Sequence, residues 1–139
     1  EQCNPVDVTE PDPSLELQYA VPFLVDLESA LAGYAESGTG CSINLSLLPL
    51  SEAEVEFIDH RLGRGPVDVL SRAYGKCQVI STQTPNIWWV RYYNAMGTLI
   101  LNTLEVSDIP QVVCAAPEDL RDSAERLNDI LAPYWSDVA

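Results

Sequence analysis

Basic side chains are scarce in this sequence, and none of them lies in its first 60 residues. Seven Lys and Arg stand against 21 Asp and Glu, which gives a net charge of −14 over 139 residues. Such a chain repels the phosphate backbone of nucleic acids and the anionic surface of membranes. We therefore expect neither nucleic acid nor a membrane as a partner. The acidic half either keeps the protein soluble, which is the commoner role of such surfaces, or steers a basic partner segment toward it.

Long apolar runs are also absent. No stretch approaches the roughly 18 uncharged apolar residues that a membrane-spanning helix requires, and the N-terminus has neither the basic start nor the apolar core of a signal peptide. We therefore expect a cytoplasmic protein. A chain of 139 residues with 47% hydrophobic content suits one globular domain. Residues 1–14, rich in proline and acids, are predicted to be a flexible lead-in, and residues 15–139 a single domain.

The usual catalytic signatures are missing. The sequence contains no GxSxG elbow, no HExxH helix, no phosphate-binding glycine loop and no dinucleotide fingerprint. Its single histidine, His60, follows Glu56 by one helical turn, and a surface histidine beside a glutamate is more common than an acid–base pair. We predict that the chain is not an enzyme and has no catalytic residues.

The four cysteines form no CxxC pair, so no zinc or iron–sulfur motif is present locally. Buried free thiols in a reducing cytosol are the default for a domain of this size. Cys77 is the best candidate for a reactive thiol, because the ammonium of neighbouring Lys76 favours a thiolate. A metal or redox site would require Cys77 to meet Cys41 or Cys114 in space. We otherwise expect no metal and no other cofactor.

Three segments have the three- and four-residue spacing of apolar side chains that is typical of amphipathic helices. The first begins at Pro22, which suits a first turn because its missing N–H would be unpaired there anyway. The second opens with Ser51 and Glu54, the spacing of a capping box. The predicted helices cover residues 22–37, 52–62 and 119–134.

Five segments have the character of strands. Residues 42–50 alternate between apolar and other side chains, and four stretches rich in β-branched and aromatic residues follow, at 67–72, 77–82, 87–93 and 98–106. Short turns separate these four, which predicts three hairpins in succession. We therefore predict an α+β fold, an antiparallel β-meander sheet with helices packed on one face, in the order α-β-α-β-β-β-β-α.

The strand at 87–93 is the best candidate for a binding surface. Its alternate side chains face opposite ways, so that Trp88, Val90 and Tyr92 share one side and Trp89, Arg91 and Tyr93 the other. We expect the first set, which is the more apolar, to face the helices. The second set contains the residue types enriched in interface hot spots and is expected to face outward. Alternatively, these aromatics cover their own sheet, with the stem of Arg91 lying across Trp89.

The turn after this strand extends the candidate surface. If residues 95–97 form a three-residue loop with Gly97 in the left-handed conformation, Leu99 and Leu101 join the outer face. The predicted partner-binding residues are then Trp89, Arg91, Tyr93, Leu99 and Leu101.

Five segments together carry a resemblance to a known family: Gly63–Val67, Leu70–Cys77, Asn86–Asn94, Leu99–Val106 and Glu118–Leu127. They cover about half of the chain in order and with compatible spacing, and they resemble the C-terminal conserved region of the HupH/HyaF family of hydrogenase expression and formation proteins. Longer family members resemble two tandem copies of this region, whereas this chain contains one.

The resemblance implies an accessory role in the maturation of a nickel–iron uptake hydrogenase. It implies a non-catalytic chaperone or scaffold that binds a hydrogenase precursor subunit and other maturation proteins. Two alternatives come from other classes of protein: a thiol-based metal or redox carrier in hydrogenase cofactor assembly, and a structural subunit that acts as a homodimer.

Overall fold

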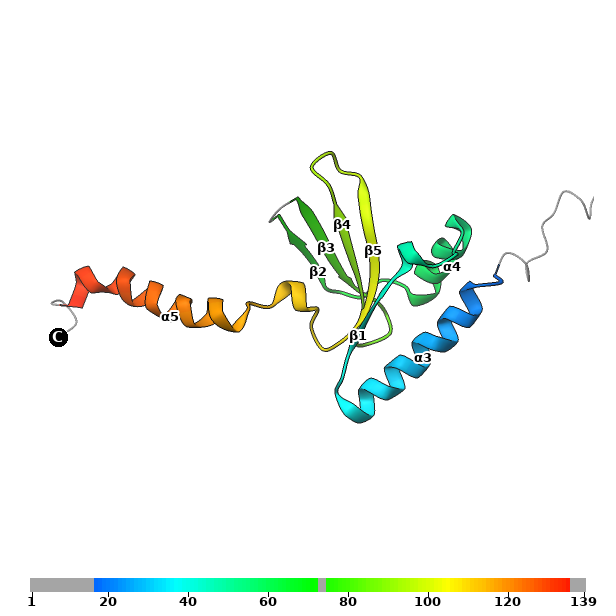
Figure 1. Ribbon diagram of the computed structural model, residues 1–139, viewed down its shortest axis with the longest axis horizontal. Coiled ribbons are helices and arrows are strands. Elements are labelled where there is room, and N and C mark those ends of the chain that lie inside the picture. Colours follow the sequence, from blue (N-terminus) through cyan, green and yellow to red (C-terminus); the bar gives the residue numbers. More distant parts are fainter. Residues whose placement is uncertain (1–16, 73–74, 136–139) are drawn as a thin grey trace, which may run out of the picture.

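The computed structural model describes residues 17–72 and 75–135, so the predicted lead-in at 1–14 lies outside the described residues. The helices are α3 (Ala20–Ser37), α4 (Glu52–Leu62) and α5 (Pro117–Leu131), and the strands are β1 (Cys41–Asn44), β2 (Asp68–Ser71), β3 (Lys76–Ser81), β4 (Ile87–Tyr93) and β5 (Leu99–Val106). Short 3₁₀ helices η1 (Leu45–Leu47), η2 (Gln111–Val113) and η3 (Ala132–Tyr134) connect or extend them. The predicted α+β class and element order are confirmed (Figure 1).

The five strands form one antiparallel sheet in the order β1-β5-β4-β3-β2. Strands β2 to β5 follow one another as hairpins, as the turn residues predict. The loop between β4 and β5 contains residues 95–97, with Gly97 at a φ of 82°, which confirms the left-handed glycine. Strand β1 completes the sheet beside β5, with Cys41 opposite Val106.

The predicted strand at 42–50 is wrong in its second half. Strand β1 ends at Asn44, whose side-chain Oδ1 accepts a hydrogen bond from the backbone N–H of Ser46 at 2.9 Å. This cap turns the chain into η1, and Leu47 becomes 81% exposed instead of joining Ile43 on one face. The chain from Leu45 to Leu50 is therefore a loop that crosses from the sheet to α4.

Glu54 joins the N-terminal ends of two helices. Its Oε1 accepts from the N–H of Ser51 at 3.1 Å, which closes the predicted capping box of α4, and its Oε2 accepts from the N–H groups of Tyr19 and Ala20 at 2.8 and 2.7 Å. Burial alone raises the pKa of this carboxyl, but the hydrogen bonds from the Ser51, Tyr19 and Ala20 backbones outweigh burial and hold its pKa below the usual value. The ionised Glu54 thus fixes the start of α3 against α4.

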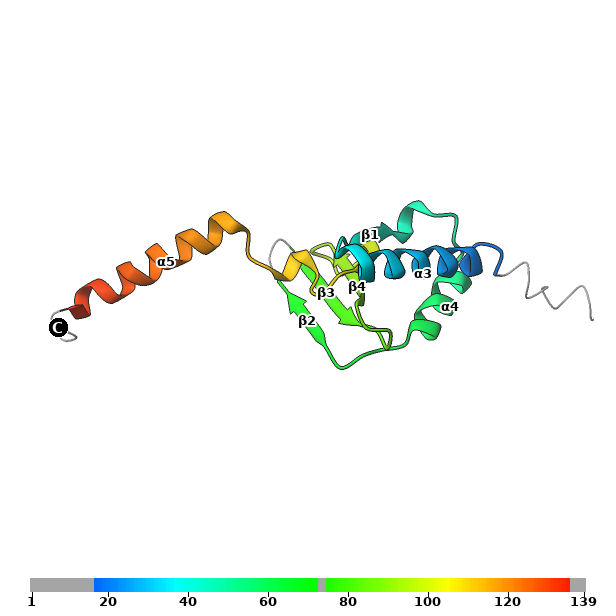
Figure 2. The same ribbon diagram turned by 90° about the horizontal axis from the view of Figure 1, so that it is seen from below.

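Helices α3 and α4 pack on one face of the sheet (Figures 1 and 2). The main core lies between these two helices and the sheet. Trp89 of β4 is fully buried there, between Ile80 of β3 and Leu104 of β5. Ile58 of α4 and Leu27 of α3 close the same core from the helix side. We call this side of the sheet the covered face.

The predicted orientation of β4 is therefore wrong. Trp89 faces the helices, and Trp88 lies on the opposite side, partly buried, with its Nε1 donating to the carbonyl of Ser107 at 3.1 Å. The cross-strand neighbours explain this outcome. Trp89 lies opposite two aliphatic side chains, whereas Trp88 lies opposite Ser81 and Glu105. The row that contains Trp89 is apolar on all three strands, whereas the row that contains Trp88 is polar on both neighbouring strands, and the helices bury the side of Trp89.

The other side of the sheet, which we call the open face, carries a small second cluster. It contains Cys77, Val79 and Val90, with Val69, Trp88 and Tyr92 packed against them. Each of these residues belongs to a strand, and no helix contributes to the cluster. In the described part of the chain, helices pack on the covered face alone.

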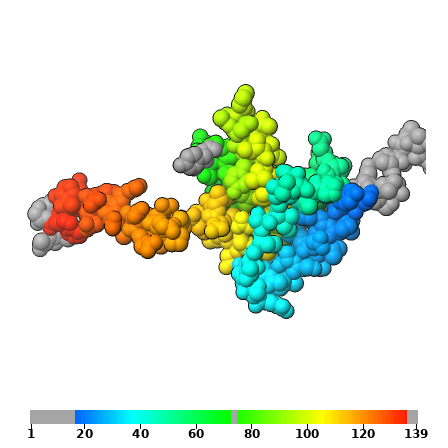
Figure 3. All heavy atoms as spheres, in the orientation of Figure 1, coloured from blue at the N-terminus to red at the C-terminus, as the bar shows by residue number. Residues whose placement is uncertain are grey.

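Helix α5 does not join the other two helices. It leaves the sheet after η2 and extends away from the body, on the side opposite α3 and α4 (Figures 1 and 2). Every residue of α5 is exposed. Figure 3 shows it as an arm that projects from the rest of the molecule.

Candidate functional site

A groove of about 540 Å³ opens between the loop Leu45–Leu50, the first turns of α4 and the outer end of β5. Most of its walls are aliphatic, and two carboxylates of α4 stand on its rim. The residues that line it are Leu45, Ser46, Leu48, Leu50, Glu52, Val55, Glu56, Leu99 and Asn102. We call it the α4–β5 groove.

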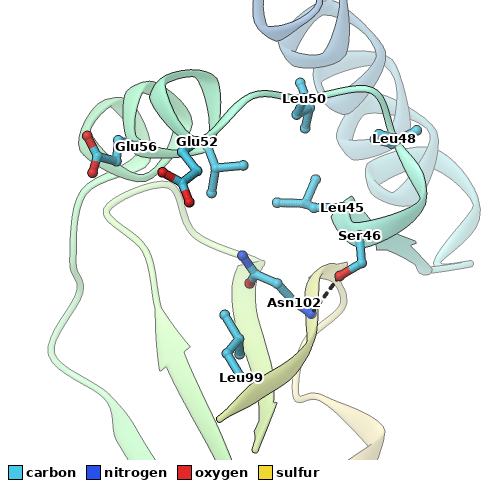
Figure 4. Close-up of a pocket in the computed structure, with 9 residues that line it drawn as sticks. Leu45, Ser46, Leu48, Leu50, Glu52, Glu56, Leu99 and Asn102 are labelled. Atoms are coloured by element: carbon cyan, nitrogen blue, oxygen red, sulfur yellow. Dashed lines mark hydrogen bonds between the residues drawn. The ribbon is translucent and has the colours of Figure 1, made fainter.

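The close-up in Figure 4 shows how the walls are arranged. Leu45, Leu48 and Leu50 come from the loop, Glu52 and Glu56 from α4, and Leu99 and Asn102 from β5. The N–H of Asn102 donates to the Oγ of Ser46 at 3.4 Å, which ties the loop to β5. The groove therefore combines an apolar lining with negative charge at one edge.

A second hollow, of about 390 Å³, lies on the other side of the same loop. Leu48 and Leu50 line both hollows. The second hollow is bounded by the first turns of α3 and is almost entirely apolar, with Asp26 as its charged residue. The loop Leu45–Leu50 thus separates two neighbouring apolar depressions, each with carboxylate on its border.

Arg91 supports the β5 wall of the groove from the covered face. Its Nε donates to Oδ1 of Asn102 at 3.3 Å, and its guanidinium pairs with Oδ2 of Asp59 on α4 at 3.4 Å. The guanidinium carbon also lies 4.5 Å from the centre of the Trp89 ring, a cation–π distance. Arg91 is thus a link between sheet and helix, and the group that lies over the Trp89 ring is its guanidinium.

The structure does not bring the five predicted partner-binding residues onto one surface. Trp89 is fully buried in the core, Arg91 is held by Asp59, and Tyr93 is partly buried with Lys76 over its ring. Leu99 is 43% exposed and lines the groove.

Leu101 lies on the opposite face from Leu99. A register shift at Tyr92 and Tyr93 places Leu99 opposite Tyr93 and Leu101 opposite Tyr92, so the expectation that both leucines share a face is wrong. A partner-binding role for Arg91, Tyr93, Leu99 and Leu101 stays a prediction.

Sequence reasoning missed the loop and α4 walls of the groove. Leu48 and Leu50 fall in the predicted strand at 42–50, and Glu52 falls in the predicted helix at 52–62 with no role assigned to it. Pro49 was the available signal, because a proline between leucines interrupts a strand and exposes neighbouring side chains. His60, predicted to be a surface residue, is exposed on α4.

The thiol assignment also changes. Cys77 is buried on the open face, and burial raises the pKa of its thiol, which disfavours the thiolate. Lys76, the neighbour expected to favour it, lies over the ring of Tyr93 on the covered face instead. Three strand spacings separate β3 from β1, so Cys41 and Cys77 are at least about 14 Å apart. They also lie at opposite ends of the sheet, because Cys41 is level with Ile87 of β4 and Cys77 with Tyr92. Cys77 and Cys41 therefore form no shared site.

Within residues 17–72 and 75–135, no group of three or more His, Cys, Asp or Glu is placed to hold a metal ion. No described helix is both long and apolar enough to cross a membrane.

Comparison with known proteins gives a consistent family. Residues 17–134 match the family described as "HupH hydrogenase expression protein, C-terminal conserved region". The hydrogenase expression/formation protein HupQ of Azotobacter chroococcum is 54% identical over 117 residues, which are 83% of this chain and 41% of that protein. HupH of Rhizobium leguminosarum bv. viciae is 44% identical over 115 residues, with the same two shares.

A solved structure agrees with the fold. The hydrogenase expression protein HupH from Thiobacillus denitrificans superimposes with a TM-score of 0.77 at 29% identity, covering 82% of this chain and 95% of that chain. The present chain spans about two-fifths of the length of the two curated relatives.

Proposed function

Since the chain belongs to the HupH hydrogenase expression protein family, in its C-terminal conserved region, we propose that it is an accessory chaperone or scaffold in nickel–iron hydrogenase maturation. In this role it binds a precursor subunit of the hydrogenase, and other maturation proteins, in the cytoplasm without catalysing a reaction. The observation that carries the proposal beyond the family is the α4–β5 groove, an apolar depression with carboxylates on its rim.

The chemistry of the groove favours a peptide segment with both apolar and basic side chains. Leu45, Leu48 and Leu99 offer apolar contact, and Glu52 and Glu56 on the rim attract Lys or Arg. Such segments are accessible in a precursor subunit, because parts of its chain that are buried in the mature subunit are still exposed. Holding that segment would keep it from aggregating while the cofactor is assembled.

The test is binding of the purified chain to each hydrogenase precursor subunit, measured by biolayer interferometry at several salt concentrations. The double variant Glu52→Gln/Glu56→Gln should bind more slowly and lose most of its salt dependence, because exposed charges are screened beyond roughly 8 Å at physiological ionic strength. Leu99→Asp should raise the Kd about tenfold, as loss of an interface contact does.

The matched control is Glu28→Gln/Glu36→Gln, which removes two exposed carboxylates of α3 outside both hollows. It should bind as the unaltered chain does. If the unaltered chain binds neither precursor, the proposed function fails. If it binds and all variants match it, the function stands and the groove is not the site.

The alternative role, a thiol-based metal or redox carrier, finds less support. Cys77 is buried with a raised pKa, whereas a carrier requires an accessible thiolate. Metal analysis of protein purified without oxygen separates the two roles. One tightly bound metal ion per chain, lost in Cys77→Ser, would favour the carrier over the chaperone.

A further inference from the structure

Helix α5 carries an apolar stripe with no partner in the described part of the chain. The stripe follows helical spacing through Leu120, Leu127 and Leu131 of α5 and continues beyond the end of this helix to Tyr134 of η3 and Trp135. Each of these five side chains is between 40 and 68% exposed. The carboxylates Glu118, Asp122, Glu125 and Asp129 repeat at the same spacing on the opposite side. A helix of this pattern is stable in water only when its stripe packs against another apolar surface.

The open face of the sheet is the corresponding unpartnered surface. Trp88, Tyr92 and Val69 surround its centre and are only partly buried, because no helix packs over them. Along the strands it is as long as α5: a helix of 15 residues spans about 22 Å, and a strand of seven about 23 Å. The two surfaces match in character and in length.

The chain between the two surfaces holds them apart. Cys114 and Ala116, which follow η2, have extended backbones with ψ of 146° and 151°. They lead α5 away from its own sheet (Figures 1 and 3). The segment before them remains attached to the body, because the N–H of Gln111 donates to Oε2 of Glu105 at 3.1 Å.

We propose that α5 packs on the open face of a second copy of this chain, so that two copies exchange their C-terminal helices. The exchange covers both stripes and both open faces in a single symmetric interface. The proposal is independent of the hydrogenase precursor, because both surfaces belong to this chain.

The size and charge of the two surfaces support a second copy as the occupant. A half-exposed large side chain offers roughly 100 Å², so two stripes with the sheet surface beneath them bury on the order of 1,500 Å², enough for a stable interface. Glu105 is the charged residue of β4 and β5 on the open face, and Arg121 and Arg126 border the stripe of α5. The carboxylates on the opposite side of α5, Glu118, Asp122, Glu125 and Asp129, then face solvent.

The experiment uses the full chain in sedimentation equilibrium over a range of concentrations. We expect a reversible dimer that strengthens as salt rises, because two copies of charge −14 repel one another. Leu127→Asp on the stripe should raise the dimer Kd at least about tenfold. Glu125→Gln, on the polar side of the same helix, should leave it unchanged. Circular dichroism checks that both variants keep their fold.

A second measurement distinguishes exchange from other arrangements. Isotope-labelled and unlabelled chains are mixed, and isotope-filtered NOEs are recorded between the methyl groups of Leu127 and the side chains of Val69 and Tyr92. NOEs between copies support the exchange. NOEs within a monomeric chain would show that α5 folds back on its own sheet and would overturn it. A monomer without such NOEs, or a dimer that tolerates Leu127→Asp, would also overturn it. A failure to bind precursor leaves this result unaffected.

Discussion

The two faces of one sheet differ in what covers them, although the strand at their centre is aromatic on both sides. The covered face places Trp89 beneath α3 and α4 and excludes water from it completely. The open face leaves Trp88 and Tyr92 partly exposed over a cluster made only of strand residues. Alternating side chains of similar type thus have different roles, because packing partners and not residue type decide how much an aromatic contributes to stability.

The sharpest test of this difference compares the two tryptophans. Trp89→Ala should lower the free energy of unfolding by roughly 3–5 kcal/mol, as removal of a fully buried aromatic side chain does. Trp88→Ala should cost much less, because water already reaches part of its ring. Urea denaturation of both variants measures the two values. The comparison is made at concentrations where the chain is monomeric, because a dimer with exchanged α5 helices would cover Trp88 as well. Equal losses in the monomer would mean that its open face is covered in solution.

Loss of the Glu54 side chain should destabilise the packing of α3 on the covered face and leave the cluster on the open face unchanged. Glu54→Ala removes three hydrogen bonds from a buried carboxylate and should cost about 3 kcal/mol. Glu56→Ala, on the exposed side of the same helix, is the matched control and should cost little. Hydrogen exchange should then show faster opening of α3 and unchanged protection in β3. A uniform loss of protection would contradict the local role.

The same carboxyl predicts a dependence on pH. Its folded pKa is held below the unfolded value of about 4.3. The stabilisation is therefore present above pH ~4.3 and is lost as the pH falls from there through the folded pKa. Glu54→Gln should weaken the acid sensitivity of unfolding in that window. An identical pH profile for the variant and the unaltered chain would show that Glu54 contributes nothing to it.

Arg91 should matter more than Arg64, although both pair with Asp59. The side chain of Arg91 is 13% exposed and that of Arg64 is 54% exposed. Arg91→Ala leaves Asn102 without its donor and Asp59 with only the exposed Arg64, and should cost about 1–3 kcal/mol, whereas Arg64→Ala should cost less than about 1 kcal/mol. Thermal unfolding of the two variants measures the difference. The reverse order would mean that the covered face depends on the exposed pair.

The smallest effect concerns thiol chemistry and leaves stability unchanged. Cys77 is buried on the open face with a raised pKa, whereas Cys41 and Cys114 are exposed. In the native protein, Cys77 should react with a disulfide reagent at least about tenfold more slowly than Cys41 or Cys114. Mass spectrometry of partly modified protein gives the rates. Fast modification of Cys77 would mean that the open face unfolds locally.

Local signals in the sequence predicted most elements correctly. Ser51 and Glu54 define the start of α4 through a cap that needs only neighbouring residues, and Gly97 defines the loop between β4 and β5 through its own backbone preference. The strand at 42–50 was predicted too long, because the Asn44 cap competes with the alternation of apolar residues. These outcomes depend on residues close together in the chain.

The α4–β5 groove and the positions of the aromatic side chains depend on residues that are distant in the chain. Leu48 of the loop and Leu99 of β5 line one depression only because the sheet and α4 bring them together. The sequence also predicts that α5 is amphipathic, but it does not predict where α5 lies. An apolar stripe indicates that a helix packs against another apolar surface, but it does not identify that surface.

The amino-acid sequence by itself determined the element order, the hairpins and the family of this protein, because each follows from local spacing or from similarity along the chain. Only the tertiary structure decided that Trp89 faces inward. Side chains alternate along a strand in either orientation, and the choice came from Ile80 and Leu104 on the neighbouring strands, which complete an apolar layer with Trp89 but not with Trp88.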